Sequence, residues 1–392
     1  MGHTIALNFE DGFTRFVEGR PGETVADASY RVGINIPLDC RDGACGTCKC
    51  RVQSGEYEAG DYIEDALTDE EAAEGLALAC QMRPKSDVVV DVFASSEVCK
   101  TKGQSFQARI ASVDRLSATS IAFSLEGAGA ISFLPGQYVN VLVPGSDQRR
   151  SYSFSSPPGA ERQSFLIRDI PHGRMSTFLR ETQPGTPVEF VGPSGSFYLR
   201  EVRRPLLFLA GGTGLAPFLS MLGKLADTGT GGQPVHLVYG VTNDEDLVGV
   251  EQLEAYAARV PGFTFTTVVA AEGSGHPRRG YVTAHIEPSQ LNGGDVDVYL
   301  CGPPPMVDAV RSWLGAQGVT PTNFYYEKFS PSGAVTAIGE THRSAAWGSH
   351  DDVLRTLPGQ GRRRDRSCSG HRPQRGAPPR PRGWESCPGG PL

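Results

Sequence analysis

The sequence lacks the features of a membrane-spanning or exported chain. No apolar run approaches the roughly 18–20 residues that a membrane-spanning helix needs. The N-terminus also lacks the basic-then-apolar pattern of a secretory signal. We therefore expect no membrane association and a cytoplasmic location. Although the chain has nine cysteines, disulfide bonds are not expected, because cytosolic thiols stay reduced.

Positive charge is scarce in most of the chain. The net charge is −7 over 392 residues, but residues 340–392 hold ten Arg against five acidic residues, so residues 1–339 carry −12. An acidic body argues against nucleic acid as a partner. The length predicts about two to three domains, each large enough for its own core.

Residues 340–392 differ in composition from the rest of the chain. They contain seven Pro, eight Gly and no Lys, with no sustained apolar periodicity, a composition that predicts disorder. A nucleic-acid-binding arm is the alternative, but the only aromatic residues are Trp347 and Trp384. We favour a frame-shifted or read-through terminus.

Four cysteines have the spacing of an iron–sulfur ligand set. Cys40, Cys45 and Cys48 follow the pattern C-x4-C-x2-C, and Cys80 comes about thirty residues later, which is typical of a plant-type 2Fe–2S cluster. Zinc also accepts four thiolates, but structural zinc sites usually join one C-x2-C to a second close pair, and Cys80 stands alone. The sequence therefore predicts a 2Fe–2S cluster and an electron-transfer protein.

This cysteine loop lies in a first small domain, over residues 3–96. Alternating residues predict a hairpin turned at Asp11-Gly12, and Thr68 with Glu71 forms a capping box that opens a helix ending at Gly75. We also expect a helix over 25–32, a strand over 88–92 and a polar connector over 95–103. Acidic residues between the third and fourth cysteines form a candidate docking face for a partner, with a solvated helix surface as the alternative: Asp61, Glu64, Asp65, Asp69, Glu70, Glu71 and Glu74.

Two further domains are predicted after the connector. Closely spaced β-rich runs with Pro-Gly punctuation predict an antiparallel barrel over 103–202, with one helix at 175–181. Short buried-type strands separated mostly by helices then predict a parallel α/β domain over 203–335, with strands at 206–210, 235–239, 263–269 and 296–300. The expected fold class is multidomain α+β and α/β.

Two segments of the barrel carry candidate flavin-binding residues. Strand alternation places Arg150 and Tyr152 on one face, with Ser151 and Ser153 on the other. Arg offers a planar fork to a pyrophosphate, and Tyr offers an aromatic face to a ring system. Residues 173–177 open a helix whose free N–H groups suit a phosphate. Each motif alone is weak, because simple packing and an ordinary helix cap are the alternatives.

The third domain carries candidate nucleotide-binding residues. Gly211 and Gly214 lie in a glycine turn between a strand and a helix, without the G-x-G-x-x-G spacing. Cys301, before Gly302 and a run of prolines, ends another strand, where open α/β sheets bind ligands; a small buried hydrophobe is the alternative. Asp244 lies in an acidic loop that suits a ribose hydroxyl and repels a 2′-phosphate, which favours NADH over NADPH; a merely solvated loop is the alternative.

In this order the motifs resemble the ferredoxin–NADP reductase superfamily, and within it the reductase components of benzoate, toluate and anthranilate 1,2-dioxygenases. The resemblance covers roughly residues 3–335 and implies a 2Fe–2S cluster, FAD and NADH. It implies catalytic roles for Ser153, Cys301, Glu327 and Phe329, with Ser153 beside flavin N5 and Phe329 covering the flavin ring. The cofactor-binding residues are Arg150, Tyr152, Ser153, Arg168, Met175, Ser176, Gly211, Thr213, Gly214, Asp244, Cys301, Gly302, Pro303 and Phe329.

The resemblance also implies an electron path. NADH gives two electrons as a hydride, an iron–sulfur cluster accepts one at a time, and FAD handles both. The acceptor would be the Rieske centre of a separate oxygenase, and the reductase is expected to be a monomer. Three alternatives remain open: the reductase of a bacterial diiron monooxygenase, a non-enzymatic ferredoxin-type carrier, and the inactive product of a disrupted reading frame.

Overall fold

The computed structural model describes residues 2–100 and 103–329, all within a unit that spans Met1–Ala334. The segment 340–392, for which we predict disorder, lies outside the described residues. In the part of the chain that is described, no helix combines the length and the apolar character needed to cross a bilayer.

Alternating apolar residues build the N-terminal sheet. Its strand order is β2-β1-β7-β3-β5, and the side chains of Ile5, Leu7 and Val90 are fully buried in its core. The predicted hairpin, first helix and capping-box helix are all present. The elements are β1 (His3–Phe9), β2 (Thr14–Gly19), α1 (Val25–Arg31), β3 (Lys49–Ser54), β4 (Tyr57–Glu58), α2 (Asp69–Ala73), β5 (Leu76–Leu78), β6 (Arg83–Pro84) and β7 (Val88–Val92).

The connector after β7 differs from its prediction. Ser96–Lys100 forms a short helix, α3, in which Cys99 is buried. The Asp11 carboxylate accepts hydrogen bonds from the backbone N–H and the hydroxyl of Ser96, both at 2.8 Å. A polar sequence therefore became ordered because the hairpin turn supplies a partner for the first turn of the helix.

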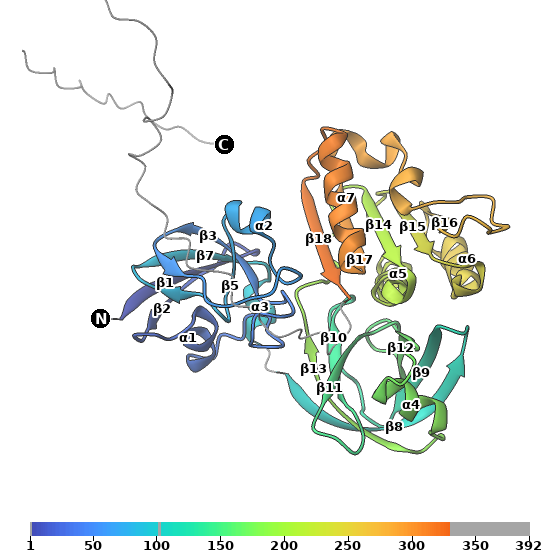
Figure 1. Cartoon of the computed structure of the whole chain (residues 1–392), viewed down its shortest axis with the longest axis horizontal. Helices are drawn as coiled ribbons and strands as arrows, with labels where there is room; N and C mark the ends of the chain where they lie inside the picture. The colour runs from blue at the N-terminus through green and yellow to red at the C-terminus, as the bar shows by residue number, and fades with distance from the viewer. Residues whose placement is uncertain (1, 101–102, 330–392) are drawn as a thin grey trace, which may run out of the picture. The chain divides into compact units, whose positions relative to one another are not determined.

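The middle domain is the predicted antiparallel barrel (Figure 1). Its strand order is β11-β10-β13-β8-β9-β12, and a bridge between Phe154 and Phe165 joins the two edges. The aromatic side chains of Phe154, Phe165 and Phe190 fill the interior. The elements are β8 (Gln104–Arg115), β9 (Ser120–Glu126), β10 (Tyr138–Leu142), β11 (Arg149–Ser153), β12 (Gln163–Arg168), α4 (Arg174–Glu181) and β13 (Pro187–Ser194).

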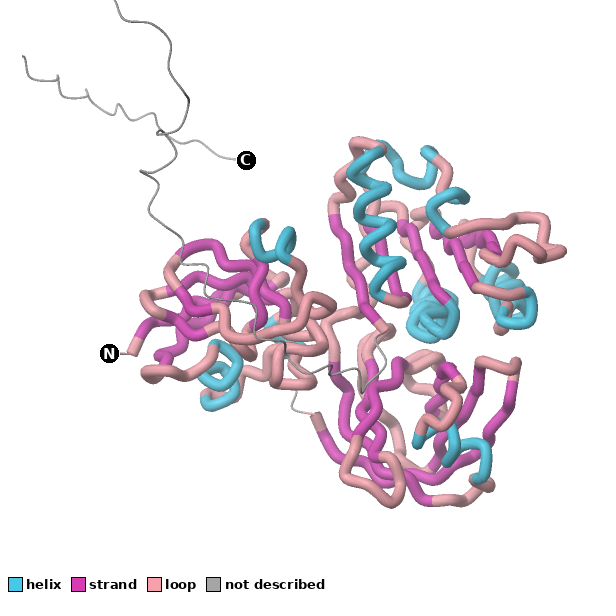
Figure 2. The backbone as a smooth tube through the Cα atoms, in the orientation of Figure 1, coloured by secondary structure: helices cyan, strands magenta, loops and turns pink. Residues whose placement is uncertain are grey.

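The last domain is a parallel sheet between two layers of helices (Figure 2). Its order is β16-β15-β14-β17-β18; α5 and α6 pack on one face, and α7 packs on the other. The elements are β14 (Leu206–Gly211), η1 (Gly212–Leu215), α5 (Ala216–Thr228), β15 (Val235–Val241), η2 (Asp244–Asp246), α6 (Val250–Arg259), β16 (Phe263–Val269), η3 (Val282–His285), η4 (Pro288–Gly294), β17 (Asp297–Gly302), α7 (Pro304–Ala316) and β18 (Asn323–Lys328). The sequence did not predict β18, whose aromatic and charged residues lack a strand-like alternation.

Candidate functional site

The four predicted ligand cysteines come together at one end of the first domain. Cys40 and Cys45 lie in the loop after α1, Cys48 directly precedes β3, and Cys80 follows β5. The loop folds tightly at Gly43, where φ is +79° and an added Cβ would meet the carbonyl oxygen of Asp61 at 2.4 Å. Only glycine allows this close approach.

The cysteine sulfurs are close enough to perturb one another. The Cys40 sulfur accepts hydrogen bonds from the thiols of Cys45 and Cys80, so the pKa of Cys40 falls well below its ordinary value. The same contacts raise the pKa values of Cys45 and Cys80. The backbone N–H of Ala44 also donates to the Cys40 sulfur, over 3.3 Å. Four converging thiols with a backbone donor turned toward sulfur fit a 2Fe–2S cluster.

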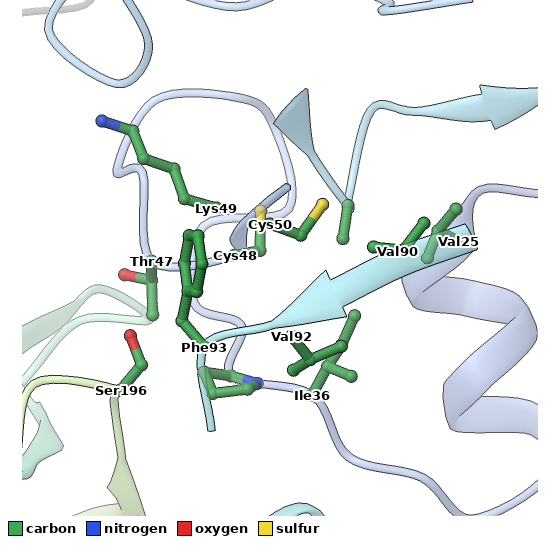
Figure 3. Close-up of a pocket in the computed structure, with 12 residues that line it drawn as sticks. Val25, Ile36, Thr47, Cys48, Lys49, Cys50, Val90, Val92, Phe93 and Ser196 are labelled. Carbon is green, nitrogen blue, oxygen red and sulfur yellow. The ribbon is translucent and has the colours of Figure 1, made fainter. Parts of the chain in front are cut away.

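Cys48 and the neighbouring Cys50 lie beside a small cavity in the first domain. Figure 3 shows Cys48 and Cys50 beside a small apolar cavity that Val25, Ile36 and Val92 also line, while the Lys49 side chain extends away from it. Burial raises the pKa of the Cys50 thiol well above its ordinary value, so Cys50 stays a protonated core residue.

The barrel presents Ser153 and Tyr152 as the alternation predicted. Tyr152 packs edge-on against Phe123 at the barrel core, with ring centroids 6.0 Å apart, and Ser153 is buried on the opposite face. The Arg150 guanidinium is partly exposed and donates to Gln148 Oε1 at 3.0 Å. Its fork is therefore available at the edge of the barrel, where a pyrophosphate would be held.

The start of α4 offers backbone groups rather than side chains. Met175 and Ser176 are buried, and the Ser176 hydroxyl accepts a hydrogen bond from the Ile170 N–H at 3.0 Å. Gly173 at the N-cap supplies no side-chain cap, so the first N–H groups of the helix keep their capacity for an anion. Arg168, at the end of β12, is exposed.

Three predicted catalytic residues meet at the ends of strands from two domains. The Ser153 hydroxyl donates to Glu327 Oε2 at 3.2 Å, and the Cys301 sulfur lies 4.0 Å from the same oxygen. Cys301 and Glu327 are register partners on β17 and β18. Burial, with a further contribution from the negative charge of Asp39, raises the pKa of Glu327 to about 8. Burial and then Glu327 raise the pKa of Cys301 well above its ordinary value. Ser153, Cys301 and Glu327 thus form a proton-holding trio, in which the Glu327 carboxyl favours its protonated form at neutral pH.

The fourth predicted catalytic residue, Phe329, directly follows β18. Its backbone N–H donates to the Gly302 carbonyl oxygen at 2.9 Å, and its ring packs partly buried against the core cluster that includes Cys301. The backbone of the aromatic residue is thus fixed beside the proton-holding trio.

The glycine turn brings two strand ends into close contact. A Cβ on Gly214 would meet the carbonyl oxygen of Cys301 at 2.3 Å, and a Cβ on Gly211 would meet Met306 Sδ at 2.6 Å and Pro303 Cδ at 3.1 Å. Gly302 packs against the same sulfur. Thr213 lies partly exposed in η1, a 3-10 turn that separates the strand from α5. These glycines are therefore needed for the packing of the two strand ends, whereas nothing lies within 4 Å of a Cβ added to Gly212, so the backbone is open at that position of the turn.

The acidic loop after β15 divides its carboxylates between two roles. Asp246 accepts hydrogen bonds from the Asn243 amide at 3.1 Å and from the Thr119 hydroxyl of the barrel, so it stabilises the loop. Asp244 is exposed and accepts from the Ser274 hydroxyl at 2.7 Å. Only Asp244 and Glu245 face solvent where a ribose could bind.

The acidic docking face needs one correction. Glu71 has no exposed side-chain surface and is 2.7 Å from both Lys49 Nζ and Arg311 Nη1. The Tyr326 hydroxyl, on β18, also donates to it. Glu71 therefore joins the first domain to the last and cannot contact a partner. The other six acidic residues are exposed.

Sequence reasoning missed the residues that connect the domains. Glu10 pairs with Arg200 at 2.9 Å, and Asp39 accepts hydrogen bonds from Asn140 and Ser151 on the barrel. These residues belong to no motif. The sequence feature that could have drawn attention to one of them is the position of Asp39 directly before a ligand cysteine.

Family models match three consecutive parts of the chain. Residues 8–85 match a 2Fe-2S iron–sulfur cluster binding domain, residues 107–198 an oxidoreductase FAD-binding domain, and residues 208–312 an oxidoreductase NAD-binding domain. Each match contains the corresponding cysteines, barrel strands or glycine turn. The three cofactor types predicted from the sequence are thereby confirmed.

Full-length relatives show the same arrangement. The toluate 1,2-dioxygenase electron transfer component of Pseudomonas putida is 58% identical over 336 residues, which cover 85% of this chain and all of that protein. The anthranilate 1,2-dioxygenase electron transfer component of Acinetobacter baylyi is 41% identical and covers 85% of this chain and 98% of that protein. The crystal structure of an Amycolatopsis cytochrome P450 reductase, at 32% identity, has a TM-score of 0.63 and covers 84% of this chain and 99% of that one.

Proposed function

Because this chain belongs to the family of electron transfer components of aromatic-ring 1,2-dioxygenases, we propose that it takes electrons from NADH and delivers them to the Rieske centre of a benzoate-type oxygenase. When bound, FAD accepts a hydride and releases electrons singly to the 2Fe–2S cluster. The observation that carries the proposal is the contact of Ser153 with Glu327 beside Cys301, on the same barrel that contacts the cysteine loop.

The chain's own residues have separate tasks in this scheme. Cys40, Cys45, Cys48 and Cys80 hold the iron. Arg150, Tyr152 and the first N–H groups of α4 hold FAD, while the turn at 211–214 and the Cys301 strand end receive the nicotinamide nucleotide. Phe329 covers the flavin ring until the nicotinamide takes its place. Ser153 and Glu327 hold a proton beside the reacting ring.

The choice of NADH is proposed from the exposed carboxylate of Asp244. A second phosphate on the ribose would face this negative charge. We expect kcat/KM for flavin reduction to be at least about tenfold higher with NADH than with NADPH, equivalent to about 1.4 kcal/mol. Asp244→Ser should lower the ratio of kcat/KM for NADH to kcat/KM for NADPH. Asp227→Ser, at an exposed helix end, should leave this ratio unchanged. A ratio near one in the unaltered protein contradicts the NADH assignment.

The oxygenase partner is tested by reconstitution. The purified reductase with NADH should reduce the Rieske centre of a purified benzoate-type oxygenase component, as its EPR signal reports. Cys45→Ser should retain flavin reduction but lose transfer to the Rieske centre, because the cluster cannot assemble. We further propose that the reductase is a monomer and that it works in the cytoplasm, where thiols stay reduced.

A monooxygenase partner is the second candidate. It is favoured by the reductase component of a propane 2-monooxygenase from Rhodococcus jostii, which is 32% identical over 341 residues that cover 83% of this chain. Rates of electron transfer to a benzoate-type oxygenase and to a monooxygenase component, measured with the same reductase preparation, separate the two.

A further inference from the structure

A polar contact joins the cysteine loop to the strand pair β10–β11. Asn140 Nδ2 donates to Asp39 Oδ1 at 3.0 Å, and the Ser151 hydroxyl lies 3.1 Å from Asp39 Oδ2 and 2.7 Å from Asn140 Oδ1. Asn140 and Ser151 are directly opposite each other in the strand register. Asp39 precedes the ligand Cys40. Both strands of the barrel therefore hold one carboxylate at the entrance of the cysteine loop.

The face of the strand pair that makes this contact also reaches the catalytic trio. Tyr138 and Ser153 are register partners two residues away from Asn140 and Ser151, and residues at these positions share one face of the pair. Tyr138 is 4% exposed. It lies near the side chains of Asp39, Cys45 and Glu327. One continuous face thus runs from the cysteine loop to the proton-holding trio.

We propose that Asp39, Asn140 and Ser151 are positioning residues for electron transfer between the flavin and the 2Fe–2S cluster. They fix the cysteine loop against the strands that carry the flavin-binding residues. The inference rests on the proposed function, in which NADH supplies two electrons as a hydride and each electron then leaves the reduced flavin and enters the oxidised cluster.

Hydrogen bonds suit this task because they fix both distance and direction. The rate of electron transfer falls steeply as the donor and acceptor separate, so a small displacement of the loop has a large effect. A carboxylate held from two strands resists sliding along either one. Thr47 in the cysteine loop and Ser196 after β13 line the same cavity (Figure 3), so a second part of the loop also lies against the barrel.

The decisive variant is Asn140→Asp, which keeps the side-chain shape but places two carboxylates against each other. Like charges at hydrogen-bond distance repel, so the loop should move away from the barrel. In stopped-flow experiments on the holoenzyme, flavin reduction by NADH should stay within about twofold, and reduction of the cluster should slow by about tenfold or more. The double substitution Asn140→Asp with Asp39→Asn restores a carboxylate–amide pair and should recover most of the rate.

Ser151→Ala has a matched control in the same barrel. Ser112→Ala removes a hydroxyl that bonds only to Ser124, over 2.9 Å, on β8 and β9. Ser151→Ala should slow cluster reduction severalfold, and Ser112→Ala should not. An unchanged rate in Asn140→Asp, or no recovery in the double variant with full iron and FAD content, overturns the proposal. Parallel loss of flavin reduction would also overturn it, by assigning Asn140 to flavin binding.

A structural readout separates positioning from chemistry. Hydrogen exchange of the oxidised holoenzyme without NADH should show faster exchange over 138–142 and the cysteine loop in Asn140→Asp, reversed in the double variant. Unchanged exchange in both segments contradicts the contact itself. If the unaltered protein fails to pass electrons from NADH to flavin, the proposed function fails; if it succeeds and the variants match it, only this inference fails.

Discussion

Glu327 is a carboxyl group whose protonation the fold changes in the range of physiological pH. Its pKa rises from the ordinary 4.5 to about 8, mainly because the side chain is buried. The folded protein therefore holds a proton that the unfolded chain has released. The contribution of the Glu327 carboxyl to the free energy of unfolding is fully present below pH 4.5 and is lost as the pH rises toward 8.

We predict that Glu327→Gln removes this loss. The difference in thermal midpoint between the variant and the parent should increase from pH 5 to pH 8. The increase should correspond to at least about 1 kcal/mol of unfolding free energy in favour of the variant. The same substitution should weaken the pH dependence of flavin reduction near pH 8, since the titrating group is gone. Glu64→Gln, at an exposed position, is the control. If the difference in thermal midpoint between Glu327→Gln and the parent does not change with pH, the raised pKa of Glu327 is contradicted.

Glu71 is the second residue whose surroundings decide its role. Burial acts to raise its pKa, but the Lys49 charge and the hydrogen bonds from Lys49 and Tyr326 lower the pKa of Glu71 to about 2. Burial lowers the pKa of Lys49 to about 8. The sequence correctly placed Glu71 in a capping box, but it could not show that Arg311, 240 positions later, completes the ion pair.

We predict that Glu71→Leu destabilises the protein by about 3–5 kcal/mol at pH 7, because it leaves the buried charge of Lys49 without its carboxylate partner, whereas the half-buried Arg311 keeps Glu74. The deficit should shrink as the pH falls from 4.5 toward 2, where the parent carboxylate becomes protonated. Glu74→Gln should change stability by less than about 0.5 kcal/mol, since that carboxylate is largely exposed. Denaturant unfolding of both variants, followed by circular dichroism, is the measurement. A loss of under 1 kcal/mol for Glu71→Leu would mean that the pair is not buried in solution.

At the scale of elements, the candidate nucleotide-binding residues lie at the ends of strands. The sequence predicted β14 to β17 because each is a short apolar run, and it predicted the turn after β14 from its glycines. It missed β18 because that strand carries Tyr and Glu residues that contact other domains, and Lys328, which pairs with Asp308 on α7. Tyr326 reaches Glu71 and Glu327 reaches Ser153. A strand built for such contacts has no simple apolar pattern.

We predict that Gly214→Ala weakens NADH binding by about tenfold or more, because the new methyl group would overlap the Cys301 carbonyl oxygen and push the turn away from β17. Gly315→Ala is the matched control. Nothing lies within 4 Å of its added Cβ, in a helix, and it should stabilise by about 0.5–1 kcal/mol. Titration of the FAD-loaded protein with NAD⁺ gives the affinity. Equal affinity in Gly214→Ala and the parent contradicts the close packing of these strand ends.

At the scale of the whole molecule, local patterns predicted the three domains but not how they meet. Motif spacing is read within tens of residues, whereas the contacts between domains join Glu10 to Arg200 and Lys49 to Tyr326, 190 and 277 positions apart. These contacts use ordinary charged and aromatic residues. The cofactor types were therefore predictable, and the arrangement of the cluster, flavin and nucleotide sites required the structure.

The segment 340–392 gives the prediction at this scale. The match to the Pseudomonas putida relative covers all of that protein but only 85% of this chain, so the excess has no counterpart there. Its composition, with ten Arg, seven Pro and eight Gly, cannot supply a core. Deletion of 340–392 should leave iron content, FAD content and ferricyanide reductase activity within about twofold. A truncation after Glu327, which also removes Phe329, should instead change the flavin absorption spectrum and nicotinamide affinity. Loss of FAD in the shorter deletion alone would make the segment part of the folded reductase.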